Sequence, residues 1–306
     1  MKPDVLLLNP LLPEIDARLR ERYTVHNFYE CDDKSALVDN VGERIRGVVT
    51  GGATGIKQEL MQQLPSLEIV AVNGIGTDAV DLDYAHARGI HVSTTPGVLT
   101  DDVADLAIGL LIACARGLCT GDQFVRRGHW GKTQLPFSRR FSGMRVGIVG
   151  LGRVGRAIAV RAAAFGCPIH YTDIQPISDT PYRYFDNIHE LASNCDALIL
   201  AASADNAKAI VDATVLRSLG ENGYLINVAR GRLVNEPELV AALKARVIAG
   251  AGLDVFVDEP NVPNELLDMD NVVFQPHRGS ATVETRRAMG DIVLASLDAA
   301  LGRKAS

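Results

Sequence analysis

The sequence predicts an α/β protein made of two doubly wound domains. Short apolar runs alternate with helical segments along the chain, which is the pattern of parallel sheets covered by helices. A polar connection rich in Gly and Pro, residues 126–143, separates two such series. The length of 306 residues exceeds that of one ordinary core and suits two domains.

The first series covers the first third of the chain. The expected strands are residues 4–8, 47–51, 67–74 and 90–94, and the expected helices are residues 13–23, 57–64 and 82–89. A longer helix is expected over residues 100–118, with Thr100 or Asp101 as its N-cap. Because this helix is apolar on almost all sides, we expect it to be buried between domains or subunits.

The second series contains six expected strands, enough for a complete doubly wound sheet: residues 145–150, 168–173, 196–202, 224–229, 250–256 and 271–276. The helices are expected at residues 153–165, 186–193, 212–219 and 235–244. The last of these begins with a capping-box pattern, in which Asn235 is the N-cap and Glu238 reaches back. A final helix, residues 282–301, has no sheet of its own, so we expect it to pack on the first domain.

Composition excludes several classes of protein. Hydrophobic residues make up 47% and charged residues 22%, as in folded globular proteins. The net charge of -6 and the scattered Lys and Arg residues argue against a nucleic-acid-binding surface. No uncharged run approaches the ~18 residues of a membrane span, and no signal peptide is recognised. Five cysteines without CxxC spacing favour reduced thiols and a cytoplasmic location.

A glycine-rich turn predicts a dinucleotide site. Gly150, Gly152 and Gly155 form G-x-G-x-x-G directly after an expected strand and at the start of a helix. The first Gly permits the tight turn, the second lets the backbone approach a pyrophosphate, and the third lets helix and strand pack closely. The pyrophosphate would bind at the helix N-terminus, where Arg153 and Val154 lie.

Asp173 predicts the type of nicotinamide cofactor. It ends the next strand, eighteen residues (173 − 155) after Gly155, where an acid accepts hydrogen bonds from the adenosine ribose. Its charge would repel a 2′-phosphate, and the following "IQP" offers no arginine. The sequence therefore favours NAD(H), while Arg153 and Arg156 leave NADP(H) open. The alternative is a solvated loop Asp.

Four ordered motifs resemble one family over essentially the whole chain. "VGIVGLGRVG", "LINVARGRLVNEPELVAAL", "GAGLDVFVDEP" and "PHRGSAT" are similar to those of the D-isomer-specific 2-hydroxyacid dehydrogenases. Within that family the chain looks most similar to hydroxypyruvate, glyoxylate and hydroxyphenylpyruvate reductases. The resemblance implies a Rossmann NAD(P)-binding domain, residues 99–282, inserted in a flavodoxin-like substrate domain, residues 1–98 plus 283–306. It also implies a D-2-hydroxyacid product and a homodimer, with the helix from Thr100 and the adjoining loop at the interface.

The family's catalytic residues correspond to Arg230, Glu259 and His277. The reaction asks for the same residue types, because reducing a 2-oxoacid needs a hydride, a proton for the ketone oxygen and a cation for the carboxylate. The ordinary pKa of histidine, ~6.5, suits His277 as the proton donor. Glu259 would stabilise its imidazolium. The planar guanidinium of Arg230 would hold the carboxylate and keto oxygens.

The resemblance also assigns substrate and cofactor contacts. Backbone N–H groups at Gly74, Ile75 and Gly76 would bind the substrate carboxylate, and the alternative is an ordinary strand-to-helix turn. Asp254 matches a family position near the nicotinamide carboxamide, with a structural turn role as the alternative. Ala229 is a cofactor candidate, and Asn227 lies on the same strand end. Substrate specificity would depend on loops at residues 51–55, 74–78 and 129–141.

Two features depart from the family pattern. Arg278 places a second cation beside His277. The segment "LAASADNAKAI", residues 200–210, lacks the Pro-rich motif that is usual in the family at this position, where the adenine is expected to pack. Trp130, the only tryptophan, is expected to have a packing role, and the alternative is a contact with a substrate pocket.

Rival functions remain open at this point. Formate and phosphite dehydrogenases share the fold, but the formate enzymes lack a Glu partner such as Glu259. Phosphoglycerate dehydrogenases often carry an added regulatory domain, although short forms exist. A nucleotide-sensing, corepressor-like protein would bind the cofactor without turnover. No metal site is expected, and the expected partner is a small 2-oxoacid or 2-hydroxyacid, with no nucleic acid and no membrane.

Overall fold

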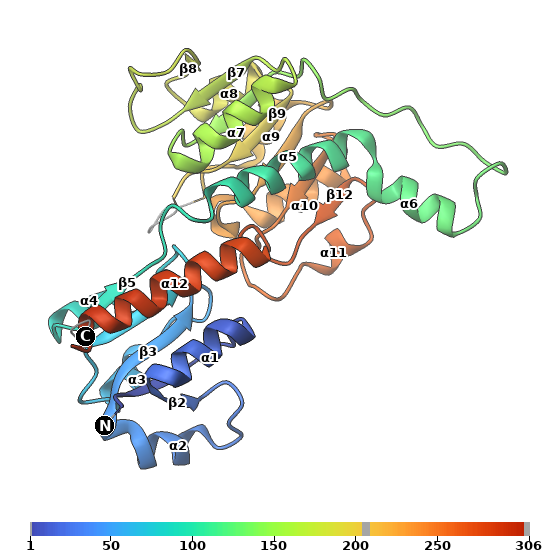
Figure 1. The fold of residues 1–306 in the computed structure, drawn as a ribbon. Coiled ribbons are helices and arrows are strands. Elements are labelled where there is room, and N and C mark those ends of the chain that lie inside the picture. Colours follow the sequence, from blue (N-terminus) through green and yellow to red (C-terminus); the bar gives the residue numbers. More distant parts are fainter. Residues whose placement is uncertain (1, 204–208, 303–306) are drawn as a thin grey trace. The chain divides into compact units, whose positions relative to one another are not determined.

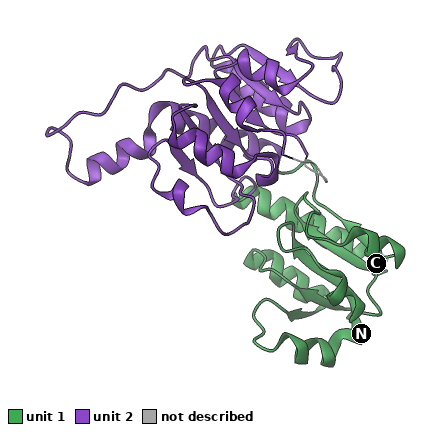
Figure 2. Cartoon of the chain, turned by 180° about the vertical axis from the view of Figure 1, so that it is seen from behind, with its two compact units in different colours: residues 1–99, 281–306 green, residues 100–280 purple. Residues whose placement is uncertain are grey.

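The computed structural model describes residues 2–203 and 209–302, and these divide into two compact units (Figure 2). Unit 1 comprises residues 1–99 and 281–306, and unit 2 comprises residues 100–280. The expected boundaries at 98/99 and 282/283 lie within two residues of these divisions. Most of the shortened adenine-side segment, residues 204–208 of 200–210, lies outside the described residues.

Unit 1 contains a parallel sheet of five strands in the order β2-β1-β3-β4-β5 (Figure 1). The strands are β1 (Asp4–Leu7), β2 (Thr24–Asn27), β3 (Ile45–Gly51), β4 (Ile69–Asn73) and β5 (His91–Ser93). The chain order reverses between β1 and β3, so ligands are expected outside the carboxyl ends of these strands. Strand β2 was not predicted, because "TVHN" has neither an apolar run nor strict alternation.

Helices cover both faces of the unit 1 sheet. They are α1 (Pro13–Arg22), α2 (Lys34–Val41), the short 3₁₀ turn η1 (Gly42–Arg44), α3 (Gln58–Gln62), α4 (Leu82–Ala87) and α12 (Val283–Ala300). Buried side chains of α12, among them Val293 and Leu297, share one core with Ile15 and Leu19 of α1 and with β1 and β3. The final helix of the chain therefore packs on the first sheet.

Unit 2 contains a parallel sheet of seven strands in the order β12-β11-β10-β9-β6-β7-β8. The strands are β6 (Val146–Val149), β7 (Ile169–Thr172), β8 (Arg183–Tyr184), β9 (Ala197–Leu200), β10 (Tyr224–Asn227), β11 (Gly250–Leu253) and β12 (Val272–Phe274). The four central strands β6, β9, β10 and β11 are buried throughout, as expected for parallel strands covered on both faces. The prediction of six strands was wrong by one, because β8 is a two-residue edge strand without an apolar run.

The helices of unit 2 are α5 (Thr100–Arg116), α6 (Leu118–Arg126), α7 (Arg153–Ala164), α8 (Ile188–Ser193), α9 (Ala213–Leu219), the 3₁₀ turn η2 (Gly231–Leu233), α10 (Glu236–Lys244) and α11 (Asn264–Leu267). Asn235 caps α10 as predicted, since its side chain accepts a hydrogen bond from the Glu238 N–H. The predicted return contact is wrong, because the Glu238 carboxylate instead accepts from the N–H of Ala213 at the start of α9.

Helix α5 ends at Arg116 because Gly117 adopts a left-handed conformation, with φ of +60°. Helix α6 and the connection after it form an arm that projects from the body of unit 2 (Figure 1). Within the described residues, no single helix has the length and apolarity to cross a membrane. Helices α5 and α6 together reach that length and apolarity, but they are bent by 59° relative to each other.

Candidate active site

Three neighbouring strands of unit 2 deliver the predicted catalytic residues to the same edge of the sheet. Arg230 follows β10, Glu259 lies in the loop after β11, and His277 follows β12. Because β10, β11 and β12 are adjacent and parallel, their carboxyl ends lie side by side. The structure thus brings together three residues that are separated by up to 47 positions (277 − 230) in the sequence.

Glu259 and His277 form a direct pair. The Nδ1 atom of His277 lies 2.6 Å from Oε2 of Glu259, and Oε1 of Glu259 accepts a hydrogen bond of 3.1 Å from the N–H of Phe256. The Glu259 carboxylate is therefore held on both oxygens. Exposed fractions of 43% for the His277 side chain and 27% for that of Glu259 leave the imidazole accessible.

His277 and Glu259 shift each other's pKa. The hydrogen bond to Glu259 raises the pKa of His277, burial opposes the rise, and the charges of Glu259 and Asp254 reinforce it. Burial alone would raise the pKa of Glu259, but the hydrogen bonds from His277 and Phe256, with the charges of His277 and Arg230, leave that pKa lowered. The arrangement favours an imidazolium beside a carboxylate.

Asp254 holds the loop that carries His277. His277 has a φ of +53°, a left-handed conformation that is uncommon for a residue other than Gly. Its N–H donates to the carbonyl of Asp254, and the next two N–H groups, of Arg278 and Gly279, donate to Oδ1 and Oδ2 of Asp254 at 2.6 and 2.9 Å. The Asp254 residue is only 1% exposed, and burial raises its pKa against the effect of these hydrogen bonds. The strained turn is therefore secured at three points.

Asn227 fixes the backbone of Arg230 in a similar way. Its amide nitrogen donates to the carbonyl of Arg230 at 2.9 Å, and its Oδ1 accepts from the N–H of Ala229 at 3.1 Å. Gly231 then packs directly against the backbone of Phe256, so closely that a Cβ atom would lie 1.9 Å from the Phe256 carbonyl carbon. The loops after β10 and β11 therefore hold each other in place.

The glycine-rich turn after β6 has the geometry that a dinucleotide requires. Gly150 has a φ of +89° and packs against Ala202, and a Cβ atom on Gly155 would lie 2.1 Å from the Gly150 carbonyl oxygen. Gly152 is the N-cap of α7, and a Cβ atom there would meet no atom within 4 Å. The first and third glycines are thus needed for packing, whereas the second faces open space at a helix N-terminus. Arg153 and Val154 begin that helix, and the Arg153 residue is exposed.

Asp173 lies beside this turn, immediately after β7. Its Oδ2 accepts a hydrogen bond of 2.7 Å from the N–H of Leu151, and its Oδ1 accepts one of 2.8 Å from the N–H of Ile174. The side chain of the following residue, Ile174, is 99% exposed. The carboxylate is therefore fixed next to the glycines, and Arg156 is paired with Asp179 at 2.7 Å.

The predicted carboxylate-binding residues lie at the carboxyl edge of the unit 1 sheet, after β4. Within the described residues, the N–H groups of Ile75 and Gly76 donate no hydrogen bond, and Ile75 is 42% exposed. The Gly74 carbonyl accepts a hydrogen bond from the N–H of Thr95, which anchors the turn. Backbone N–H groups that donate to no other atom of the described residues are suited to bind an anion.

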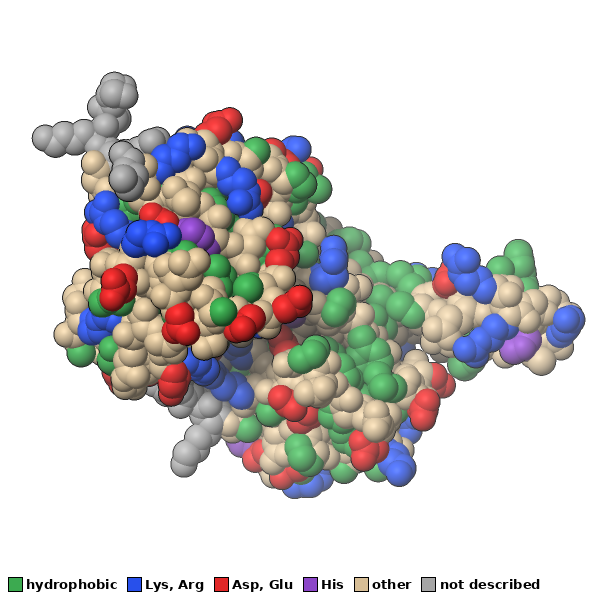
Figure 3. Space-filling view, turned by 90° about the horizontal axis from the view of Figure 1, so that it is seen from below, with side chains coloured by type: hydrophobic (Ala, Val, Ile, Leu, Met, Phe, Trp, Pro, Cys, Tyr) green, Lys and Arg blue, Asp and Glu red, His purple; other side chains and the backbone are tan. Residues whose placement is uncertain are grey.

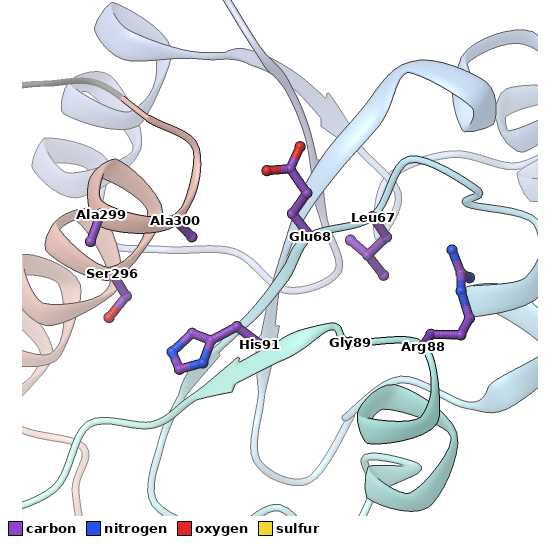
Figure 4. A pocket seen from close by; sticks show the side chains of 8 residues that line it. All are labelled: Leu67, Glu68, Arg88, Gly89, His91, Ser296, Ala299 and Ala300. Carbon is purple, nitrogen blue, oxygen red and sulfur yellow. The ribbon is translucent and has the colours of Figure 1, made fainter.

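Other features lie away from this site or contribute to it only through the backbone. A pocket of about 700 Å³ lies at the opposite, amino edge of the unit 1 sheet, between Glu68, His91 and Ser296 of α12 (Figure 4). Its Glu68 is already paired with Arg46. Trp130 is 79% exposed, so the predicted packing role within the chain is wrong. Arg278 is exposed, and its N–H is one of the bonds to Asp254. Among the described residues, no group of three His, Cys, Asp or Glu side chains could hold a metal ion.

Comparison with known proteins assigns the family. The model of the "D-isomer specific 2-hydroxyacid dehydrogenase, NAD binding domain" matches residues 108–279, more than half of the chain. The chain belongs to the D-isomer-specific 2-hydroxyacid dehydrogenase family. The predicted resemblance is confirmed, and the chain is an NAD(P)-dependent oxidoreductase of this family.

Relatives cover nearly the whole length of this family member. It is 44% identical over 296 residues to a glyoxylate/hydroxypyruvate reductase of Arabidopsis thaliana, covering 96% of this chain and 95% of that protein. It is 42% identical to a 2-ketogluconate reductase of Gluconobacter oxydans, covering 97% and 94%. A solved structure of an NADPH-dependent glyoxylate/hydroxypyruvate reductase of Sinorhizobium meliloti superposes with a TM-score of 0.91 at 41% identity, covering 99% and 95%. The predicted fold, with its Rossmann NAD(P)-binding domain, is confirmed.

Some residues that shape the site were missed by sequence reasoning. The N–H of Phe256, which orients Glu259, belongs to no recognisable motif. The supporting role of Asn227 was suggested only by its place at the end of a strand. A polar residue directly after a buried strand was the available signal, but its bonding partners depend on neighbouring loops.

Proposed function

We propose that the chain reduces a small 2-oxoacid to the D-2-hydroxyacid, with His277 as the proton donor. The observation that carries this proposal is the His277–Glu259 pair next to the loop of Arg230, at the carboxyl edge of a nicotinamide-binding sheet. When bound, the reduced nicotinamide supplies the hydride. The protein supplies the proton, the charge that holds the substrate and the geometry.

The proton would come from Nε2 of His277, because Nδ1 is held by Glu259. As the ketone oxygen gains charge it takes this proton, and the Glu259 carboxylate stabilises the imidazolium before transfer. In the oxidation of the alcohol the neutral imidazole accepts the proton. Reduction should therefore fade as pH rises through the raised pKa of His277, while oxidation improves.

Two kinds of group would hold the substrate. Arg230 offers a planar guanidinium suited to the carboxylate and keto oxygens, and Asn227 fixes its backbone. In unit 1 the N–H groups of Gly74, Ile75 and Gly76 would bind the carboxylate. This assignment gives unit 1 the role of the substrate domain, which the sequence predicts at residues 1–98 plus 283–306. Unit 2 takes the role of the dinucleotide-binding domain, which is predicted at residues 99–282.

The cofactor contacts would come from Gly150, Gly152, Arg153, Val154 and Gly155, with Asp173, Ala229 and Asp254. The open space at Gly152, beside the N-terminus of α7, fits a pyrophosphate. We propose that NADH is preferred to NADPH, because the fixed Asp173 carboxylate would bind the ribose hydroxyls and repel a 2′-phosphate. The Sinorhizobium meliloti relative is NADPH-dependent, so the proposed preference of the present chain for NADH needs a test of its own.

We further propose that the protein is a homodimer and that it is cytoplasmic. The projecting arm exposes Leu118, Val125, Trp130, Leu135 and Phe137, and Figure 3 shows hydrophobic and basic side chains on it. An apolar surface of this kind favours contact with a second copy. The cytoplasmic location is supported by five free cysteines. Light scattering of the purified protein tests the dimer, and a monomer would contradict it.

Initial rates test the function. NADH and NADPH oxidation would be measured with hydroxypyruvate, glyoxylate, hydroxyphenylpyruvate and 2-ketogluconate. We expect turnover with at least one oxoacid and a higher kcat/KM with NADH. Tight NADH binding without turnover of any of them would contradict the proposal and would favour a nucleotide-sensing protein, an alternative that the named relatives do not favour.

A further inference from the structure

Asn9 joins two strand ends at the place where the order of the unit 1 sheet reverses. It follows β1, and the adjacent strand β3 leads into the loop "GGATG", residues 51–55. Chain connections leave β1 and β3 in opposite directions here, which is where open α/β sheets bind ligands. A polar side chain that spans this point can control the shape of the substrate edge.

Both ends of the Asn9 amide are used to hold the 51–55 loop. Its Oδ1 accepts a hydrogen bond of 2.8 Å from the N–H of Gly51, and its Nδ2 donates one of 2.7 Å to Oγ1 of Thr54. Gly51 leaves room for this contact, because a Cβ atom there would lie 3.3 Å from Oδ1 of Asn9. The side chain therefore anchors both the first residue of the loop and its fourth.

The loop has few other means of holding its shape. Three of its five residues are Gly, which gain more conformational freedom than any other residue when a contact is lost. Within the loop, the N–H of Gly55 donates to the Gly51 carbonyl at 2.8 Å, and Oγ1 of the buried Thr50 donates to the Gly55 carbonyl at 2.7 Å. These bonds close the turn, whereas Asn9 fixes its position on the sheet.

The opposite side of the loop packs against the predicted carboxylate-binding turn. A Cβ atom on Gly52 would lie 3.0 Å from the Gly76 carbonyl oxygen, and one on Gly74 would lie 3.4 Å from the N atom of Gly52. Gly55, with a φ of +56°, is pressed against the backbone of Ala79, where a Cβ atom would lie 2.0 Å from the carbonyl oxygen. A displacement of the 51–55 loop would therefore move the N–H groups at residues 74–76.

We propose that Asn9 is a positioning residue for substrate binding, which acts through the 51–55 loop on the backbone N–H groups of Gly74, Ile75 and Gly76. The inference rests on the proposed function, since it takes those N–H groups as the site of the substrate carboxylate. In the proposed role Asn9 acts on the loop and not on the substrate, because its Oδ1 and Nδ2 atoms are bonded to Gly51 and Thr54. Its loss should weaken the binding of substrate and transition state equally, which raises KM and leaves kcat nearly unchanged.

Steady-state kinetics of the full-length protein test the proposal. For Asn9→Ala we expect the KM for the oxoacid to rise about tenfold, as expected for the loss of two hydrogen bonds, with kcat within about twofold of the wild type. The KM for NADH should not change, because the cofactor residues belong to unit 2. Thr54→Val, which removes one of the bonds, should raise the oxoacid KM by about threefold, and Thr54→Ser, which keeps a hydroxyl, should restore it.

The matched control is Asn27→Ala. Asn27 is the last residue of β2 in the same sheet, and its amide also makes two side-chain hydrogen bonds, with Glu30 and Arg20. It holds no substrate loop, so its removal should leave the oxoacid KM unchanged. The double variant Asn9→Ala/Thr54→Val should resemble Asn9→Ala alone, because the two residues share one bond.

Several results would overturn the inference. These are an unchanged oxoacid KM in Asn9→Ala, an equal rise in Asn27→Ala, or a parallel rise in the NADH KM accompanied by a lower unfolding temperature. A wild type without turnover contradicts the proposed function instead. Calorimetric binding of oxamate to the NADH-saturated protein then replaces KM, and either equal affinities of wild type and Asn9→Ala or no binding by either would overturn the role of Asn9.

Discussion

At the carboxyl edge of the unit 2 sheet, charged side chains follow three adjacent strands, whereas at the same edge of unit 1 exposed backbone N–H groups follow β4. Both edges are secured by uncharged or buried polar residues behind them: Asp254 and Asn227 in unit 2, and Asn9 in unit 1. The unit 2 edge can donate a proton and change charge with pH. The unit 1 edge can only bind. On the proposed function, the acid-base pair belongs to unit 2 and the backbone N–H groups that bind the carboxylate belong to unit 1. We therefore expect variants of His277 to change mainly kcat, and variants at the unit 1 edge to change mainly the KM for the oxoacid.

The largest expected effect is at His277. In His277→Ala we expect kcat for reduction to fall by about 10²–10⁴-fold, because general acid catalysis is lost, with little change in the KM for NADH. Stopped-flow and steady-state rates measure the change. A fall in kcat of less than tenfold, or a rise in the oxoacid KM alone, would place His277 with the binding groups and break the comparison.

A smaller effect is expected in the cofactor half of the unit 2 edge. Asp173→Ser combined with Ile174→Arg removes the charge that repels a 2′-phosphate and adds a cation at a fully exposed position. The ratio of kcat/KM for NADPH to that for NADH should rise at least about tenfold, as expected for a new charge-assisted contact. Asp270→Asn, which changes an exposed acid of unit 2 that is paired with Arg246 and has no assigned cofactor contact, is the control. An unchanged ratio in the double variant would argue against Asp173 as the selectivity residue.

The smallest effect on activity is expected from a change in unit 1 away from its carboxyl edge. Helix α12 crosses α1 so closely that a Cβ atom on Gly290 would lie 2.6 Å from the Ile15 side chain. Gly290→Ala should destabilise the fold by about 1–3 kcal/mol through overpacking, with kcat and both KM values unchanged. Thermal unfolding measures the loss.

Gly109→Ala is the matched control for that change. Gly109 lies in helix α5, and a Cβ atom there meets no atom within 4 Å, so the substitution should stabilise the protein by about 0.5–1 kcal/mol. If Gly290→Ala raised the oxoacid KM, the unit 1 edge would be sensitive to general destabilisation. A rise in the oxoacid KM of Asn9→Ala would then no longer be evidence that Asn9 acts locally on the 51–55 loop.

Much of the unit 2 site could be predicted from the sequence because its chemistry resides in side chains. Arg230, Glu259 and His277 were assigned from the family resemblance, and their residue types and their places after expected strands supported the assignment. The glycine-rich turn was found from its spacing. The left-handed backbone of His277 and the three hydrogen bonds that Asp254 accepts could not be predicted, because they depend on how the loops after β11 and β12 meet.

The unit 1 edge was harder to predict because backbone N–H groups leave no residue signature. Gly74 and Gly76 indicated only that close approach was allowed, and the resemblance supplied the rest. Asn9 gave no signal, since its role depends on strand order in the sheet. Strand β2 and the two-residue strand β8 were missed because they lack apolar patterns. The exposure of Trp130 was missed because the sequence does not show that the segment after α6 projects from unit 2.

The pH dependence of reduction in the wild type and in Glu259→Gln tests the central claim most directly. Glu259 raises the pKa of His277, so the protonated donor persists to higher pH in the wild type. Our account predicts that kcat/KM for oxoacid reduction falls with rising pH in both proteins, and that the fall begins at lower pH in Glu259→Gln. Oxidation of the hydroxyacid should extend to lower pH in the variant. Superimposable profiles of the two proteins would contradict the account, since Glu259 would then not set the protonation of the catalytic histidine.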